Sequence, residues 1–139
     1  MIVVDTSAIL AYMNSADTHH VEVSAWLEAE RDDLTTTPLI LAEVDHLVGE
    51  RAGPAAMSAW RADLVAGAYL VEWWPAAAVA AVGVAERYAD TGLGLADASL
   101  VVLAERVETV QIATFDERRF RAVRPLCGGD AFRVLPRDR

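Results

Sequence analysis

Residues 1–10 read MIVVDTSAIL, and this stretch determines how the rest of the chain is interpreted. An apolar run over residues 1–4 leads directly into Asp5 and then into two hydroxyl residues, Thr6 and Ser7. This pattern is typical of a buried parallel strand followed by a helix, with Thr6 or Ser7 placed to cap the helix. Ligand sites in parallel α/β sheets lie beyond the carboxyl ends of the strands, so Asp5 is expected at such a site.

Length and composition indicate a single domain spanning residues 1–139. Although 54% of the residues are hydrophobic, no apolar run reaches the roughly 18 residues that cross a bilayer. The first residues also lack the features of a signal peptide, because Asp5 interrupts their apolar run. We therefore expect a cytoplasmic protein with no membrane association. The one cysteine, Cys127, excludes an internal disulfide and cannot by itself form a cysteine-based metal site.

The formal net charge of −9 argues against passive binding of nucleic acid, since the overall field repels phosphate polymers. It does not exclude a nuclease whose metal ions reverse the sign of the charge locally. Seven of the twelve arginines lie at or beyond Arg118, and there are no lysines. This basic end is consistent with a docking surface for RNA or for an acidic partner, and equally with an ordinary solvated surface.

Apolar periodicity predicts strands alternating with helices along the whole chain. Strands are expected at 2–4, 34–36, 69–74, 110–115 and 132–135, helices at 7–13, 19–31, 39–50, 55–66, 75–90 and 96–107, and one helical turn at 117–122. Such alternation indicates parallel βαβ units. The predicted fold class is therefore α/β, a three-layer α/β/α sandwich with a central, mostly parallel sheet.

Four acidic residues stand where chemistry is expected. Asp5 and Asp116 each follow a predicted strand, which places them at the same rim of the sheet. Glu43 and Asp97 lie inside apolar helical runs, where a carboxylate is drawn toward the core. Buried carboxylates are costly unless they are paired, hydrogen-bonded or bound to a metal. Each acid alone has a simpler explanation, as a helix cap for Asp5 or as a tolerated boundary residue for Glu43 and Asp97.

The sequence offers these acids few basic partners. The arginine nearest to Glu43 is Arg51, beyond the end of its helix, and Asp97 has none before Arg106. A hard divalent cation, Mg²⁺ or Mn²⁺, would relieve the repulsion among such carboxylates. A site of this kind suits phosphodiester hydrolysis by metal-activated water. Thr6, Ser7 and Thr114 are expected to orient the carboxylates by hydrogen bonding.

Four stretches of the chain together resemble a known family. They are VVDTSAILAY (3–12), LAEVDHLV (41–48), GLGLADASLVVLAE (92–105) and IATFDERRF (112–120). The likeness runs from Met1 to about Leu135 and is to the PIN-domain ribonucleases, specifically the VapC-type toxins of type II toxin–antitoxin pairs.

The resemblance implies a PIN-like fold and a Mg²⁺- or Mn²⁺-dependent endoribonuclease that cleaves structured RNA, either tRNA or rRNA. It also implies a homodimer and a cognate antitoxin that occludes the site. The catalytic set carried over is Asp5, Glu43, Asp97 and Asp116, with Asp5, Asp97 and Asp116 as the metal ligands.

We further expect four arginines to hold the RNA backbone, namely Arg118, Arg119, Arg121 and Arg124. Two other functions stay open at this point. One is a PIN-fold nuclease of ordinary RNA maturation without an antitoxin, and the other is a non-catalytic binding module that keeps the fold.

Overall fold

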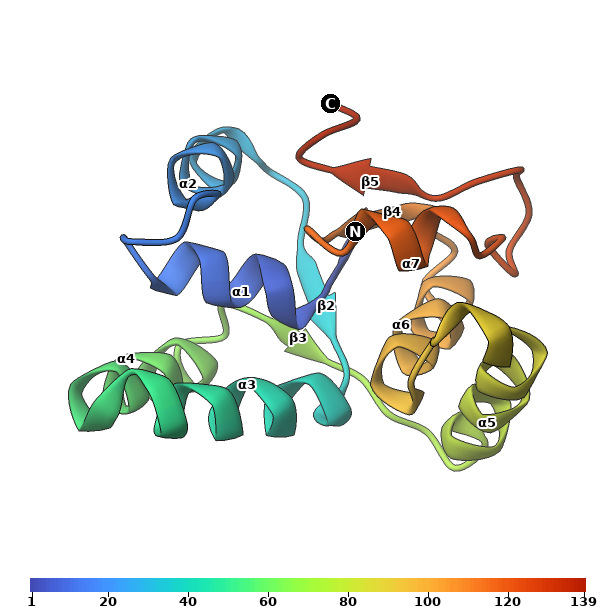
Figure 1. The fold of residues 1–139 in the computed structure, drawn as a ribbon, viewed down its shortest axis with the longest axis horizontal. Helices are drawn as coiled ribbons and strands as arrows, with labels where there is room; N and C mark the ends of the chain where they lie inside the picture. Colours follow the sequence, from blue (N-terminus) through green and yellow to red (C-terminus); the bar gives the residue numbers. More distant parts are fainter.

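Five short strands form one parallel sheet through the centre of the molecule (Figure 1). In the computed structural model, which describes residues 1–139, they are β1 (Ile2–Val4), β2 (Leu34–Thr36), β3 (Leu70–Val71), β4 (Gln111–Ala113) and β5 (Arg133–Leu135). Their order in the sheet is β3-β2-β1-β4-β5, and every neighbouring pair is parallel. Val3 pairs with Thr35 on one side and Ile112 on the other, which makes β1 the central strand.

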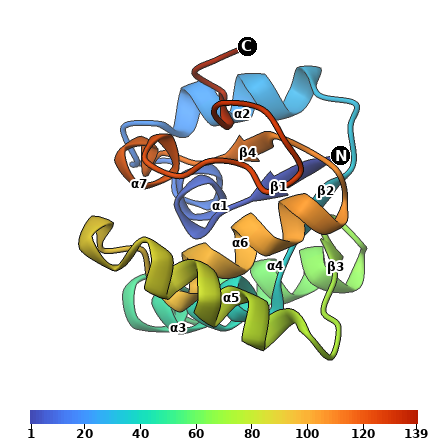
Figure 2. The same ribbon diagram turned by 90° about the vertical axis from the view of Figure 1, so that its right-hand side faces the viewer.

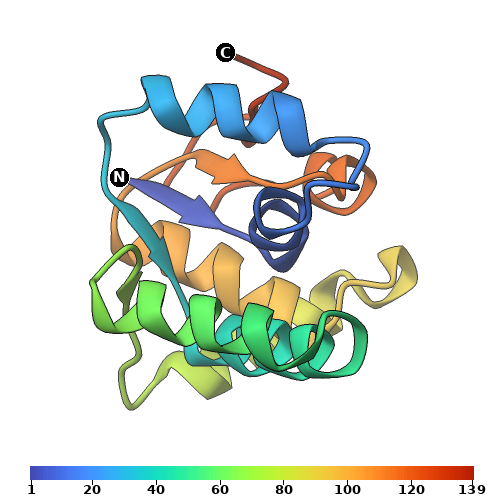
Figure 3. The ribbon, with the colours of Figure 1, turned by 90° about the vertical axis from the view of Figure 1, so that its left-hand side faces the viewer.

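Helices cover both faces of this sheet. They are α1 (Thr6–Met13), α2 (His20–Ala29), α3 (Pro38–Arg51), α4 (Gly53–Val65), α5 (Ala77–Arg87), the 3₁₀ turn η1 (Ala89–Thr91), α6 (Leu95–Arg106) and α7 (Glu117–Arg121). Figure 2 views the molecule from the side of α5 and α6, and Figure 3 from the side of α1, α3 and α4. The expected three-layer α/β/α architecture is confirmed.

Several predicted elements are shorter in the structure, including the strand expected at 110–115, which is limited to β4, and two of these differences have an evident cause. The strand expected at 69–74 is limited to β3, because the chain turns away after Val71 and Trp74 packs under the guanidinium of Arg106, 4.6 Å from its ring centroid. The helix expected to run to Asp90 ends at Arg87 and gives way to η1. Gly92 then adopts a left-handed conformation, φ 73°, which an ordinary side chain would disfavour.

The apolar pattern that predicted β1 reflects its central position. Ile2, Val3 and Val4 are all buried, since helices pack on both faces of the sheet. The next residue, Asp5, donates its backbone N–H to the carbonyl of Ala113 at the end of β4. The carboxyl ends of β1 and β4 therefore meet at one rim, and the residues that follow them are neighbours.

A buried hydroxyl pair connects the start of α3 to α6. Thr37 Oγ1 and Ser99 Oγ lie 2.8 Å apart, and both side chains are buried. This contact brings the first turns of the two helices to the same rim of the sheet. No helix of the chain combines the length and apolar character needed to span a membrane.

Candidate active site

Asp5 is the most enclosed acid of the rim, with 4% of its surface exposed. Its Oδ2 accepts hydrogen bonds from the hydroxyls of Ser7 and Thr114, each at 2.7 Å. Although Asp5 occupies the N-cap position of α1, its side chain does not cap the helix. The simpler explanation of Asp5 as a helix cap therefore fails, and both hydroxyls donate to the same oxygen, Oδ2.

The hydroxyls that hold Asp5 are themselves held by the chain after β4. Ser7 Oγ accepts the backbone N–H of Phe115 at 2.9 Å, and Thr114 Oγ1 accepts that of Asp116 at 2.9 Å. The two hydroxyl oxygens lie 3.1 Å apart. This network fixes the orientation of the Asp5 carboxylate by tying together the ends of β1 and β4.

Thr6 does not join this network, contrary to the sequence prediction. Its side chain is buried, and Oγ1 has no hydrogen-bond partner. Consecutive side chains on a helix point about 100° apart. Once Ser7 reaches toward Asp5, Thr6 therefore points elsewhere.

Asp97 stands in the first turn of α6 and is 9% exposed. Its Oδ2 accepts the backbone N–H of Gly94 at 3.2 Å, a bond that closes the start of the helix. The same oxygen accepts a hydrogen bond from Arg119 Nη1 at 3.1 Å. The sequence-based expectation that Asp97 has no nearby arginine is therefore wrong, because the fold brings a residue of α7 to the start of α6.

Arg119 also contacts Asp116, one turn earlier in the chain. Its Nε lies 3.2 Å from Asp116 Oδ2, so one guanidinium bridges two of the predicted metal ligands. Sequence reasoning assigned Arg119 to RNA binding only. The local signal for this pair was available, since three-residue spacing brings Asp116 and Arg119 together around a helix start.

Glu43 is exposed, not drawn toward the core as predicted. The buried stripe of α3 consists of Ile40, Val44 and Val48, and Glu43 lies one position away from it. Desolvation is the main cause of the raised pKa of Asp97, and the charge of Glu43 adds to it, in keeping with the Thr37–Ser99 contact that brings the starts of α3 and α6 together. It is the outermost of the acids.

Burial dominates the electrostatics of the two inner acids. Desolvation raises the pKa of Asp5 above 3.8, opposed by the hydrogen bonds from Ser7 and Thr114 and assisted by the charge of Asp97. Desolvation also raises the pKa of Asp97, opposed by the Gly94 N–H and by Arg119. Both carboxylates are therefore costly to ionise without a cation, and perturbed acids of this kind are typical of functional sites.

The donor set suits a hard divalent cation. All four acids offer carboxylate oxygens, the ligand type preferred by Mg²⁺ and Mn²⁺, and no thiol or imidazole is among them. As the side chains stand, no three His, Cys, Asp or Glu residues are arranged to hold an ion. The bridging guanidinium of Arg119 lies where two of the carboxylates would converge. Mg²⁺ commonly uses only one or two carboxylates together with waters, so this donor chemistry is sufficient.

The other predicted RNA-binding arginines have different surroundings. Arg121 is held by ion pairs to Glu117 and Asp138, at 3.0 and 2.8 Å. The side chains of Arg118 and Arg124 are exposed and form no ion pair. RNA binding by these residues stays a prediction.

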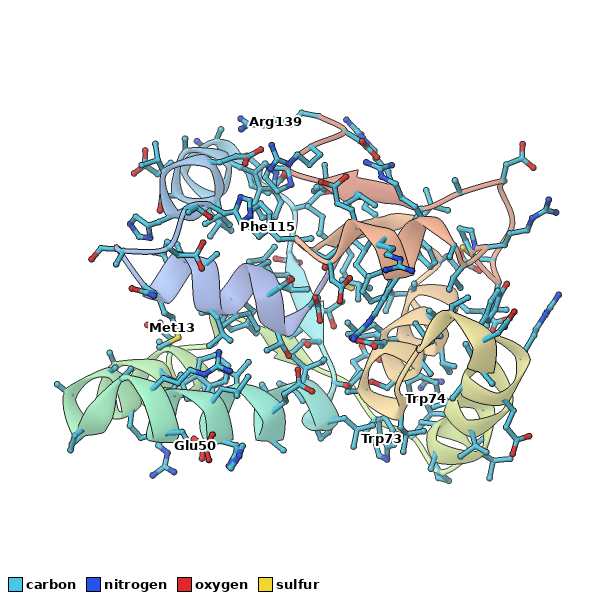
Figure 4. The ribbon with its side chains drawn as sticks, viewed as in Figure 1. Met13, Glu50, Trp73, Trp74, Phe115 and Arg139 are labelled. Atoms are coloured by element: carbon cyan, nitrogen blue, oxygen red, sulfur yellow. The ribbon has the colours of Figure 1, made fainter.

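We call the edge of the sheet that carries Asp5, Glu43, Asp97 and Asp116 the acidic rim. A groove that the sequence did not predict adjoins it at Ser7. It has a volume of about 500 Å³, begins at Ser7 and runs between α1 and the α3–α4 hairpin, with Met13 on its wall. Phe115, labelled in Figure 4, also lines this groove and stacks on His19 with ring centroids 4.1 Å apart. No sequence pattern indicated this stack, since His19 and Phe115 are far apart in the chain.

The PIN domain family model matches residues 2–125. This chain belongs to the PIN-domain family. It is also 40% identical to Ribonuclease VapC26 of Mycobacterium tuberculosis, over 97% of this chain and 100% of that protein. The predicted relationship to PIN-domain proteins of the VapC type is thereby confirmed.

Two solved structures share this PIN fold. VapC20 of Mycobacterium tuberculosis, described as a sarcin–ricin loop cleaving toxin, superposes with a TM-score of 0.81 at 23% identity, covering 90% of this chain and 100% of that one. FitAcB of Neisseria gonorrhoeae gives a TM-score of 0.62 at 22% identity, covering 86% of this chain and 91% of the other. At these identities the likeness supports the fold.

Proposed function

We propose that this PIN-domain protein is a Mg²⁺- or Mn²⁺-dependent endoribonuclease and the toxin of a toxin–antitoxin pair. The observation that carries the proposal is the Asp5 carboxylate, buried at the rim and held by Ser7 and Thr114 within the electrostatic reach of Asp97. The similarity to Ribonuclease VapC26 supports RNA as the substrate. The name of VapC20 supports a structured RNA and a toxin role.

In this proposal Asp5, Asp97 and Asp116 hold the cation, and Glu43 adds negative charge at the mouth of the site. When bound, a divalent cation supplies an activated water and stabilises the charge that develops on the attacked phosphate. Ser7 and Thr114 keep the Asp5 carboxylate in one orientation, because their hydroxyls donate to the same oxygen. The backbone N–H of Asp116, bonded to Thr114, couples the position of Asp116 to that of Asp5.

The catalytic part is tested by comparing purified wild-type protein with Asp5→Asn and Asp97→Asn on tRNA and rRNA fragments. Asp45→Asn is the matched control, since Asp45 is an exposed acid of α3 that pairs with Arg61. We expect the two site variants to lose more than about 100-fold in metal-dependent cleavage, since changes in outer-shell partners alone cost about 10–100-fold. Undiminished cleavage by either site variant would remove the proposed mechanism.

The toxin role requires a partner that neutralises the activity. We expect expression of the wild-type protein to arrest growth, and co-expression of a small DNA-binding protein encoded beside it to restore growth. Arrest should disappear in Asp5→Asn. Wild-type expression without growth arrest would favour ordinary RNA maturation, and absence of Mn²⁺ binding would favour a non-catalytic module. Homodimerisation, which we also propose, is measured by light scattering.

A further inference from the structure

Arg119 is ion-paired to both Asp97 and Asp116. It projects from the short helix α7 and bridges two acids of the rim, with Nη1 3.1 Å from Asp97 Oδ2 and Nε 3.2 Å from Asp116 Oδ2. The N–H groups of a planar guanidinium can donate to two carboxylate oxygens at once, and here they contact one oxygen of each acid. The side chain is nevertheless 44% exposed, so it approaches the carboxylates from the solvent side.

Arg119 is the only cationic side chain that contacts the acidic rim. Neither Asp5 nor Glu43 forms an ion pair, and the only ion pairs of Asp97 and Asp116 are with this arginine. The arginine thus partly neutralises the same charges that a divalent cation would neutralise.

A metal ion at this site would use the same two carboxylates as the guanidinium. Asp97 Oδ2 already accepts the Gly94 N–H and Arg119 Nη1, and Asp116 Oδ2 faces Arg119 Nε. A cation held by these carboxylates would lie near the positive guanidinium, and the two positive charges would repel each other. The like charges, and the lone pairs of Asp97 Oδ2 that are already used, place the guanidinium and the ion in competition.

We propose that Arg119 is an internal competitor for the divalent cation, a positioning residue that holds the acidic rim in the metal-free protein and leaves Asp97 when the ion binds. This inference rests on the metal site of the proposed function. The release requires only a side-chain movement, because Arg119 reaches the rim from the solvent side. The opposite role, in which Arg119 pre-arranges the carboxylates for the ion, predicts the opposite change in metal affinity.

The test is titration calorimetry of the full chain with Mn²⁺ alone, on the wild type, Arg119→Gln, Arg119→Lys and Arg118→Gln. Arg118→Gln is the matched control, because it removes one positive charge from the same helix without a contact to the carboxylates. We expect Arg119→Gln to bind Mn²⁺ roughly fivefold to tenfold more tightly, the range of an ordinary coupling between two sites. Arg119→Lys keeps the positive charge but loses the planar fork, so its Mn²⁺ affinity should lie between those of the wild type and Arg119→Gln. Arg118→Gln should stay near the wild type, because solvent screens a charge that makes no contact.

Thermal unfolding supplies a second measurement that does not depend on cleavage. In EDTA, Arg119→Gln should have a lower Tm than the wild type, because its carboxylates repel one another without a counter-ion. Adding Mn²⁺ should raise the Tm of Arg119→Gln by more than it raises that of the wild type. If Arg119→Gln fails to fold, Arg119→Lys carries the same comparison.

Weaker or unchanged Mn²⁺ binding by Arg119→Gln would overturn the inference, as would an equal gain in Arg118→Gln. An Asp5→Asn arm separates this failure from failure of the proposed function. Loss of Mn²⁺ binding in Asp5→Asn with no gain in Arg119→Gln leaves the metal site standing and removes the competitor. If neither the wild type nor any variant binds Mn²⁺, both the proposed metal site and the competitor role of Arg119 are removed.

Discussion

Thr114→Val tests how the acidic rim is held. Valine keeps the branched shape of threonine and removes one hydroxyl. That hydroxyl donates to Asp5 Oδ2 at 2.7 Å and accepts the backbone N–H of Asp116 at 2.9 Å. The substitution therefore leaves a buried carboxylate with one donor fewer and a backbone N–H without its acceptor.

The expected cost in stability follows from these two contacts. A hydrogen bond to an ionised group contributes about 1.5–3 kcal/mol, and a buried group that loses its partner adds to the loss. We expect the free energy of unfolding in EDTA at neutral pH to fall by about 2–3 kcal/mol. For a domain of this size that corresponds to a decrease in Tm of about 6–12 °C. Mn²⁺ affinity should fall by about 10–100-fold, as is usual when a group that orients a metal ligand is removed.

Thr109→Val is the matched control. Thr109 is also buried and precedes the same strand, β4, at its opposite end. Its hydroxyl donates to the carbonyl of Met1 at 2.9 Å and accepts the N–H of Gln111 at 3.1 Å. Since these partners are neutral, we expect a loss of about 1–2 kcal/mol and no change in Mn²⁺ affinity. Equal Mn²⁺ affinities of the two valine variants would refute the role given to Thr114.

Three further outcomes are expected. Burial raises the pKa of Asp5 above 3.8, so the folded protein holds the Asp5 proton more tightly than the unfolded chain does. The stability that this proton contributes to the folded state is fully present below pH 3.8 and is lost as the pH rises through the raised pKa. Asp5→Asn in EDTA should therefore gain in Tm relative to the wild type as the pH rises above about 4, and a difference that does not change with pH would contradict this. Phe120→Ala should lower the free energy of unfolding in urea by about 3–5 kcal/mol, because Phe120 is fully buried and packs edge-on against Phe132; a much smaller loss would show that α7 is not anchored by this ring. Arg61→Ala should leave Tm unchanged, since its pair with Asp45 is exposed, and a measurable decrease would show that this surface pair is stronger than its exposure indicates.

The order of elements could be predicted from sequence because apolar spacing reports local geometry. The strand at 2–4 and the strand at 34–36 were predicted with the bounds that β1 and β2 have in the structure. The strand at 69–74 was overestimated, because aromatic composition cannot distinguish an edge strand from a segment that turns to pack on another helix. Composition records which residues avoid water, but not which neighbour covers them.

The sequence by itself determined that Asp5 and Asp116 stand at one rim, since each follows a strand and parallel strands end on the same side. Only the tertiary structure decided which groups touch them there. Thr114 reaches Asp5 across 109 positions, and Arg119 reaches Asp97 across 22. Such contacts depend on β1 lying beside β4 and on α7 lying over the start of α6. Periodicity within a single segment does not encode that adjacency, because it arises from the packing of whole elements against one another.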